Sequence, residues 1–171
     1  MIFAIIVIMI ALGSCATTPL RELVEAQSPP CPEGTSRREY GSPDEFSRWC
    51  EDDTGARRGA IVHFALGRKI AEGPLEDGKL HGVYRGWTEA GRPLAERSYV
   101  AGRRHGISRT WWESGRLREL GCYVDDEKRG LWRRWDAAGD LIETVDHGAA
   151  PDDVCAGANE LASTEAALSS P

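Results

Sequence analysis

A glycine followed five residues later by an aromatic side chain recurs four times in the middle of the chain. The four openings read GAIVHF from Gly59, GVYRGW from Gly82, GISRTW from Gly106 and GLWRRW from Gly130, so they start at nearly equal intervals. Their aromatic positions are Phe64, Trp87, Trp111 and Trp135. Another glycine stands four residues after each tryptophan. Self-similarity at a nearly fixed period indicates four structural repeats.

Each repeat predicts a β-hairpin. About six residues run extended from the opening glycine, and a turn such as residues 113–115 needs positive φ at its glycine, as in a three-residue hairpin with a bulge. In the third copy we expect a second strand over residues 117–124, followed by a turn at Asp125 and Asp126. Successive hairpins predict an all-β fold, a single-layer antiparallel sheet of roughly eight strands spaced about 4.8 Å apart.

One face of this sheet carries the candidate binding residues. Side chains alternate between the faces of a strand, so the first, third and fifth positions after each opening glycine share a face. In three copies the third and fifth positions are Arg85 and Trp87, Arg109 and Trp111, and Arg133 and Trp135. Arginine and tryptophan are enriched at binding hot spots. Alternatively, the tryptophans are the core of a one-layer sheet and the arginine stems cover it.

The repeats resemble the bacterial variant of the MORN repeat. The resemblance covers residues 55–148, in copies of about 55–78, 79–102, 103–126 and 127–148, and rests on the period and the pattern G-x-x-x-x-W-x-x-x-G. The third copy adds Leu117, Gly121 and Tyr123, whereas the fourth lacks the late glycine and tyrosine, as a degenerate capping repeat does. The resemblance implies a scaffold that holds partner proteins or lipids, and some bacterial members are labelled antitoxins.

The chain starts with an apolar run over residues 2–12, which is too short to span a bilayer core of about 30 Å. The following Leu-Gly-Ser-Cys resembles the bacterial lipoprotein cleavage box. This resemblance implies that residues 1–14 are a signal peptide and that Cys15 is acylated, which gives a permanent anchor. Ala16, which follows this cysteine, resembles the residue found there in lipoproteins that are sorted to the outer membrane of Gram-negative bacteria. No Lys or Arg precedes the apolar run, so the signal is atypical or the start codon is misplaced. An ordinary signal peptide with an incidental cysteine is the alternative.

Export favours disulfide bonds between the four other cysteines. Cys31 and Cys50 bracket a segment rich in Pro and Gly turns, which favours their pairing and leaves Cys122 with Cys155. We therefore expect a disulfide-looped lead-in over residues 31–54. The polar residues 15–30 predict a tether, and residues 149–171 predict a flexible tail that is disordered or carries a short helix over residues 159–168.

Charge adds a second candidate surface. The chain has 171 residues and a net charge of −6, but residues 56–148 hold 17 basic and 14 acidic residues. The basic residues gather in the turns before the opening glycines: Arg57, Arg58, Lys79, Arg103, Arg104, Lys128 and Arg129. Along one sheet edge they would attract an anionic lipid surface, with solubilising turn residues as the alternative. The overall acidity argues against a nucleic-acid partner.

Catalysis is not expected. The sequence contains no GxSxG, HExxH or glycine-rich phosphate loop, and His81 and His105 are equivalent repeat positions. No metal or cofactor is predicted. The sequence thus predicts a non-catalytic lipoprotein of the cell envelope whose array binds an unknown protein partner or an anionic lipid surface. An antitoxin or immunity protein is one alternative, and a cell-wall or carbohydrate-binding module is another.

Overall fold

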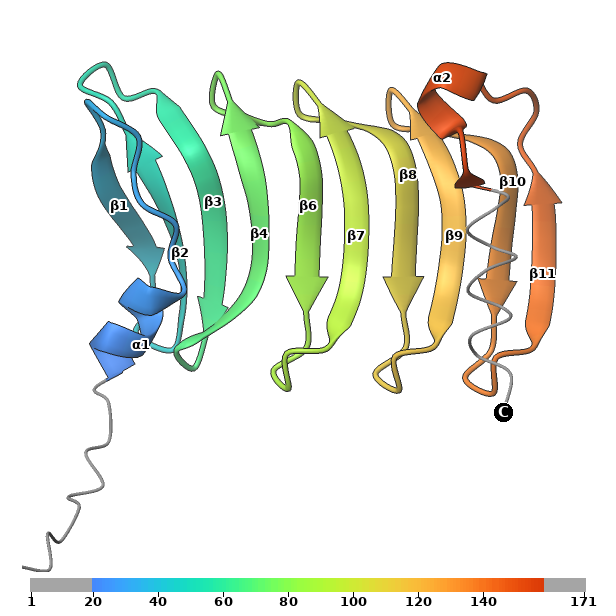
Figure 1. The fold of residues 1–171 in the computed structure, drawn as a ribbon, viewed down its shortest axis with the longest axis horizontal. Coiled ribbons are helices and arrows are strands. Elements are labelled where there is room, and N and C mark those ends of the chain that lie inside the picture. The colour runs from blue at the N-terminus through green and yellow to red at the C-terminus, as the bar shows by residue number, and fades with distance from the viewer. Residues whose placement is uncertain (1–19, 159–171) are drawn as a thin grey trace, which may run out of the picture.

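A computed structural model describes residues 20–158 (Figure 1). This part of the chain forms one antiparallel sheet of eleven strands and two short helices. The elements are α1 Leu20–Ala26, β1 Ser36–Gly41, β2 Glu45–Glu51, β3 Arg57–Ala65, β4 Arg68–Glu76, β5 Lys79–Leu80, β6 Gly82–Trp87, β7 Pro93–Val100, β8 Arg103–Trp111, β9 Leu117–Val124, β10 Glu127–Trp135, β11 Leu141–Asp146 and α2 Asp152–Cys155. The predicted signal peptide, Cys15 and the predicted helix over residues 159–168 lie outside the described residues.

The strand order confirms the predicted fold class. Neighbouring strands follow one another along the chain from β1 to β11, and only β5 leaves this path, beside β4. The sheet has more strands than the roughly eight expected, because the lead-in adds its own hairpin, β1 and β2, to the edge of the array. Figure 1 shows the result as a row of upright hairpins from β1 to β11.

The turns of the second, third and fourth repeats have the expected form, whereas the first repeat has a two-residue turn, Leu66-Gly67, between the paired residues Ala65 and Arg68. In the third copy the Gly115 N–H donates to the Trp112 carbonyl at 2.8 Å, the Trp112 N–H donates to the Arg116 carbonyl at 2.8 Å, and Gly115 has φ +88°. Beyond this turn the register slips by one residue. The same slip recurs in all four copies and leaves one bulged residue in each: Ile70, Leu94, Arg118 and Ile142. The hairpin with a bulge is therefore confirmed.

We call the turns within the repeats, at the bottom of Figure 1, the lower edge, and the turns between repeats the upper edge. We call the sheet face that carries Phe64, Trp111 and Trp135 the Trp face. Buried Val24 of α1 packs on it against Val62 and Phe64 at one end. At the other end Leu117, Leu120 and Trp135 form a second buried cluster. Two separate buried clusters thus lie on the Trp face of the described sheet.

The segment predicted as a tether, residues 15–30, contains a short helix that packs on the sheet. Residues 20–26 form α1, and Val24 is only 3 % exposed. Next to α1, the Gln27 side-chain amide donates to the Gly67 carbonyl at 3.1 Å and accepts from the Lys69 N–H at 2.9 Å. A buried valine, a bidentate amide and the ion pairs of Glu25 with Arg37 and Arg48 fix this segment to the sheet. Such long-range contacts leave no periodic signal in so short a segment.

Both expected disulfide bonds are present. Cys31 is bonded to Cys50 with 5.5 Å between Cα atoms, and Cys122 is bonded to Cys155 with 5.7 Å between them. The second bond holds α2 on the Trp face, since Cys122 lies opposite Ile107 in the register. Residues 152–155 of the predicted tail thus form a short helix that is bonded to the sheet.

Arginines of the lower edge join each hairpin to the next one. The residue after the turn glycine is arginine in three copies, and its guanidinium donates to a backbone carbonyl of the following turn. Arg68 donates to Glu89 at 3.0 Å, Arg92 to Glu113 at 3.0 Å, and Arg116 to Ala138 at 2.6 Å. The fourth copy, which has no following repeat, carries Asp140 instead. This ladder explains one recurrent use of arginine that the sequence analysis left unassigned.

Replacing Arg116 by alanine should therefore weaken the contact between the last two hairpins. We expect Arg116→Ala to lower the free energy of unfolding by about 1 kcal/mol, since it removes charge-assisted hydrogen bonds at an exposed site. Chemical denaturation measures this loss. Arg38→Ala, which removes only a 3.8 Å surface pair with Glu51, is the control and should leave the midpoint unchanged. Equal midpoints for both variants would contradict the role of the ladder.

Candidate functional site

The six candidate binding residues lie on the Trp face, as the alternation predicts, but they differ in burial. Trp135 is 5 % exposed and belongs to the cluster with Leu117 and Leu120. Trp87 and Trp111 are half-buried, and Trp111 packs against the edge of that cluster. Arg133 lies opposite Leu120 in the register of β9 and β10. Trp135 is thus core, whereas Trp87 lies in the middle of the face between the two clusters.

A glutamate missed by the sequence analysis organises the arginines. Glu96 lies between Arg85 and Arg109 in the strand register. Its carboxylate accepts from Arg109 Nη2 at 2.7 Å and from Arg85 Nε at 3.3 Å. The Arg85 side chain is 49 % exposed, while those of Glu96 and Arg109 are 26 % and 24 % exposed. The sequence could have indicated this glutamate, because Glu72 holds the equivalent position of the preceding copy. Glu72 also lies opposite Arg85 in the strand register.

Cations lie over the half-buried tryptophans. The Arg109 guanidinium carbon is 5.5 Å from the centre of the Trp111 ring. The cation over Trp87 is Lys69, at 5.2 Å, and Arg85 instead pairs with Glu96. Both tryptophans are therefore partly covered by basic side chains, as the alternative interpretation expects.

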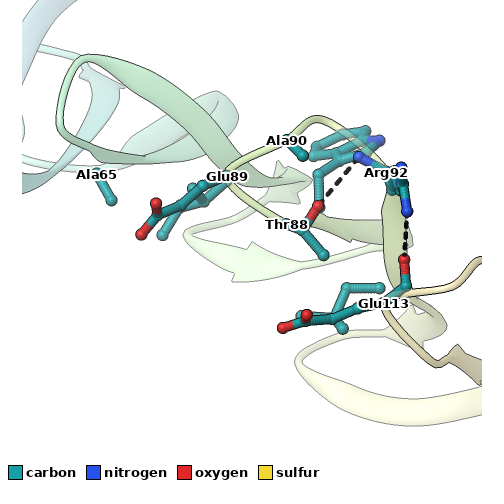
Figure 2. A pocket seen from close by; sticks show the side chains of 9 residues that line it. Ala65, Thr88, Glu89, Ala90, Arg92 and Glu113 are labelled. Atoms are coloured by element: carbon teal, nitrogen blue, oxygen red, sulfur yellow. Dashed lines mark hydrogen bonds between the residues drawn. The ribbon is translucent and has the colours of Figure 1, made fainter.

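A shallow hollow of about 690 Å³ opens beside Trp87 at the lower edge. Ile70, Trp87 and Leu94 give it an apolar side, and polar residues of two turns form its rim (Figure 2). Hydrogen bonds to the backbone fix this rim, because the Arg92 N–H donates to Thr88 Oγ1 at 3.2 Å and the Arg92 guanidinium donates to the Glu113 carbonyl. Leu94 remains 41 % exposed. The hollow thus combines an apolar floor with polar groups in fixed positions.

The opposite face, which we call the Tyr face, carries a row of aromatic rings that the sequence analysis missed. Edge-to-face pairs join Tyr84 to Tyr99 at 6.2 Å and Tyr123 to Trp132 at 4.8 Å. Arg104 lies 4.1 Å from the centre of the Tyr123 ring. Burial raises the pKa of Tyr84. Tyr99 and Tyr123 hold equivalent positions of the second and third copies, and this recurrence was the available signal. Much of this row is packing, since Tyr123 and Trp132 are buried.

On the upper edge, the basic turn residues that the sequence offered as a candidate surface lie beside acidic ones. Acidic turn residues alternate with the basic ones, so that Arg58 pairs with Asp77 at 2.9 Å and Arg104 pairs with Asp126 at 2.8 Å. The hydrogen bond from Arg104 lowers the pKa of Asp126. The charges on this edge are therefore largely matched within the protein, which leaves less attraction for an anionic surface.

Asp52 makes the upper edge sensitive to acid. Hydrogen bonds from Thr54, Ala56 and Arg58 lower the pKa of Asp52 to about 2. Its folded pKa lies below its unfolded value, so its contribution to stability is complete above about pH 4 and is lost as the pH falls through about 2. Asp52→Asn should therefore destabilise the protein at pH 7 and have little effect near pH 2. Denaturation at both pH values tests this, with Asp53→Asn as control. A deficit of the same size at both pH values would refute the linkage.

The described residues contain no arrangement of metal ligands. Between residues 20 and 158, no group of three His, Cys, Asp or Glu side chains is placed to hold a metal ion. Within the same part of the chain, no helix is long and apolar enough to cross a membrane.

Comparisons with known proteins do not place the chain in a family. No family model matches it, and no curated protein matches it. Among solved structures it is similar to a mutant of S. aureus TarM in complex with Fondaparinux, alpha-GlcNAc-glycerol and UDP, at 13 % identity and a TM-score of 0.32 over 64 % of this chain. It is also similar to the GtfA/B complex, at 14 % identity and a TM-score of 0.26 over 68 % of this chain. The chain spans only 26 % and 22 % of those two chains, respectively.

Proposed function

We propose that this protein is a non-catalytic lipoprotein of the cell envelope, whose MORN-like repeat array serves as a scaffold that binds another protein. The partner docks on the middle of the Trp face. The observation that carries this proposal is the cluster of Arg85, Glu96 and Arg109 beside Trp87 and the hollow. Acylated Cys15 holds the scaffold at the membrane, and the proposed membrane is the outer membrane of a Gram-negative bacterium.

Among residues 20–158, the two helices leave the centre of the Trp face uncovered, so that a partner can dock there. α1 covers the end that carries Val62 and Phe64, and α2 is bonded to Cys122 near the other end. Between them lie half-buried aromatic rings and arginines, the residue types that carry most of the binding energy at protein interfaces. A hydrogen-bonded sheet holds them in place, so that binding would cost little conformational entropy.

The charges favour a protein over a lipid headgroup as the partner of this face. Glu96 neutralises part of the charge of Arg85 and Arg109, so the cluster is not a simple anion site. Partially exposed Arg85 can exchange its contact with Glu96 for a carboxylate of the partner, in the way that interface charges set specificity. An antitoxin or immunity protein would use the same face against a toxin.

A carbohydrate is the second candidate ligand, and the hollow beside Trp87 supports it. Its apolar floor can take the CH face of a sugar ring, and the rim groups of Thr88, Arg92 and Glu113 offer hydrogen bonds. Binding of purified cell-wall glycan that is lost in Trp87→Ala would favour this candidate over the protein scaffold.

The test is affinity capture from envelope membranes with a matched pair of variants. Arg85 and Arg134 are comparable surface arginines, 49 % and 52 % exposed, and each is paired with a glutamate of the neighbouring strand. Arg85 lies on the Trp face, whereas Arg134 lies next to Trp135 in sequence and on the Tyr face. The proposal expects Arg85→Glu to reduce recovery of the partner at least tenfold and Arg134→Glu to leave it unchanged. Equal recovery with both variants would contradict it.

A further inference from the structure

The lower corner of the sheet beside α1 is held close to the proposed lipid anchor. Only residues 16–19 separate Cys15 from Leu20, the first residue of α1, and this distance of five extended residues is at most about 18 Å. α1 itself is fixed by buried Val24 and by the bonds of Gln27 to Gly67 and Lys69. Figure 1 shows the chain entering α1 at the lower edge, beside the turn between β3 and β4. If Cys15 is acylated, as the proposed function holds, this turn cannot move far from the bilayer.

That turn exposes a large apolar side chain. Leu66 lies at its tip, is 63 % exposed and has φ +48°, a conformation that is uncommon for residues other than glycine. The equivalent residues at the other three tips are small: Ala90, Ser114 and Ala138. The Leu66 N–H donates to the Asp44 carbonyl at 2.7 Å, which fixes the tip without burying the side chain. Leu23 of α1 is also 45 % exposed.

We infer that Leu66, together with Leu23 of α1, inserts into the interfacial region of the bilayer and orients the sheet with its lower edge toward the membrane. The inference rests on the proposed lipid anchor, which brings this corner to the lipid. Burial of one leucine side chain in an apolar environment is favourable, so the cost of exposing Leu66 is recovered at the membrane. The upper edge then faces away from the lipid, and its paired arginines take no part in the contact.

The test measures the depth of three turn residues in the acylated full-length protein. Leu66→Cys, Ala138→Cys and Ala101→Cys are each labelled with the same fluorophore and reconstituted into vesicles of neutral phosphatidylcholine that carry nitroxide-labelled lipid. Ala138 is the equivalent tip of the fourth copy, and Ala101 is an exposed turn residue of the upper edge with φ +50°. We expect quenching at position 66 to exceed that at both controls at least threefold. Equal quenching at positions 66 and 138 would overturn the inference.

Two further measurements distinguish a failure of this inference from a failure of the proposed function on which it rests. The mass of the reconstituted protein shows whether Cys15 carries acyl chains, so a missing anchor is distinguished from an anchored protein whose Leu66 stays in water. Repeating the measurement with vesicles that contain anionic lipid, first at low and then at high salt, separates apolar from electrostatic contact. Quenching that is unchanged supports insertion of Leu66. Quenching that requires anionic lipid and is lost at high salt would assign the contact to basic residues instead.

Discussion

Gly121→Ala is expected to lower the free energy of unfolding by about 3 kcal/mol, because it overpacks the Tyr face. A Cβ atom on Gly121 would lie 2.2 Å from two ring carbons of Trp132. This ring cannot easily move away, since it is 4 % exposed and its Nε1–H donates to the Cys122 carbonyl at 3.1 Å. The Tyr123 ring also limits movement of the Trp132 ring, since the centres of the two rings are 4.8 Å apart. Either the indole leaves its site or β9 and β10 separate locally.

Gly86→Ala is the matched control for this prediction. Gly86 is also a strand glycine of the array, but the nearest atoms to a Cβ there are 3.8 Å away, which is ordinary contact. The control should change stability by less than about 1 kcal/mol, the usual range for substitutions without a clash. Urea denaturation of both variants gives the comparison. If Gly121→Ala unfolds at the same midpoint as Gly86→Ala, the close contact between Gly121 and Trp132 is not a feature of the folded protein.

Replacing the two tryptophans at equivalent repeat positions, Trp135 and Trp87, should affect the stability of the protein to different extents. Trp135→Ala should lower the free energy of unfolding by about 3 to 5 kcal/mol, because it leaves a cavity beside Leu117 and Leu120 in a buried cluster. Trp87→Ala should cost much less, since this ring is half-buried beside an open hollow. The proposed function expects Trp87→Ala to reduce partner binding strongly while the protein stays folded.

Thermal denaturation and affinity capture on the same preparations separate these two roles. Trp135→Ala should melt at a lower temperature than Trp87→Ala, and Trp87→Ala should capture less partner than the unsubstituted protein. If Trp87→Ala lowers the melting temperature as much as Trp135→Ala does, both rings belong to the core. A folded Trp87→Ala variant with undiminished capture would remove Trp87 from the binding surface.

The periodic part of the fold was predictable because its causes are local. Each hairpin depends on a turn glycine such as Gly115, which requires positive φ, and on alternation along a strand of fixed geometry. Both features recur in every copy, so the sequence displays them four times. The same alternation correctly placed Arg85, Trp87 and the other candidate residues on one face.

The parts that the sequence did not reveal depend on contacts between distant segments. α1 is held by Val24 against Val62 and by Gln27 against the β3–β4 turn, and neither contact repeats. The partner of Arg85 and Arg109 was likewise unexpected, because Glu96 comes from the second strand of the hairpin, where the copies differ in sequence. The basic turns appeared as a ridge because their acidic partners, such as Asp77 and Asp126, come from neighbouring turns that pairing brings alongside.

Crosslinking in living cells shows whether the middle of the Trp face binds another envelope protein, as we propose. A photoreactive amino acid replaces either Leu94, 41 % exposed beside the hollow, or Val145, 39 % exposed and opposite Trp132 on the Tyr face. We expect a discrete protein adduct from position 94 after illumination and none from position 145. No protein adduct from position 94, or the same adduct from both positions, would contradict the proposal.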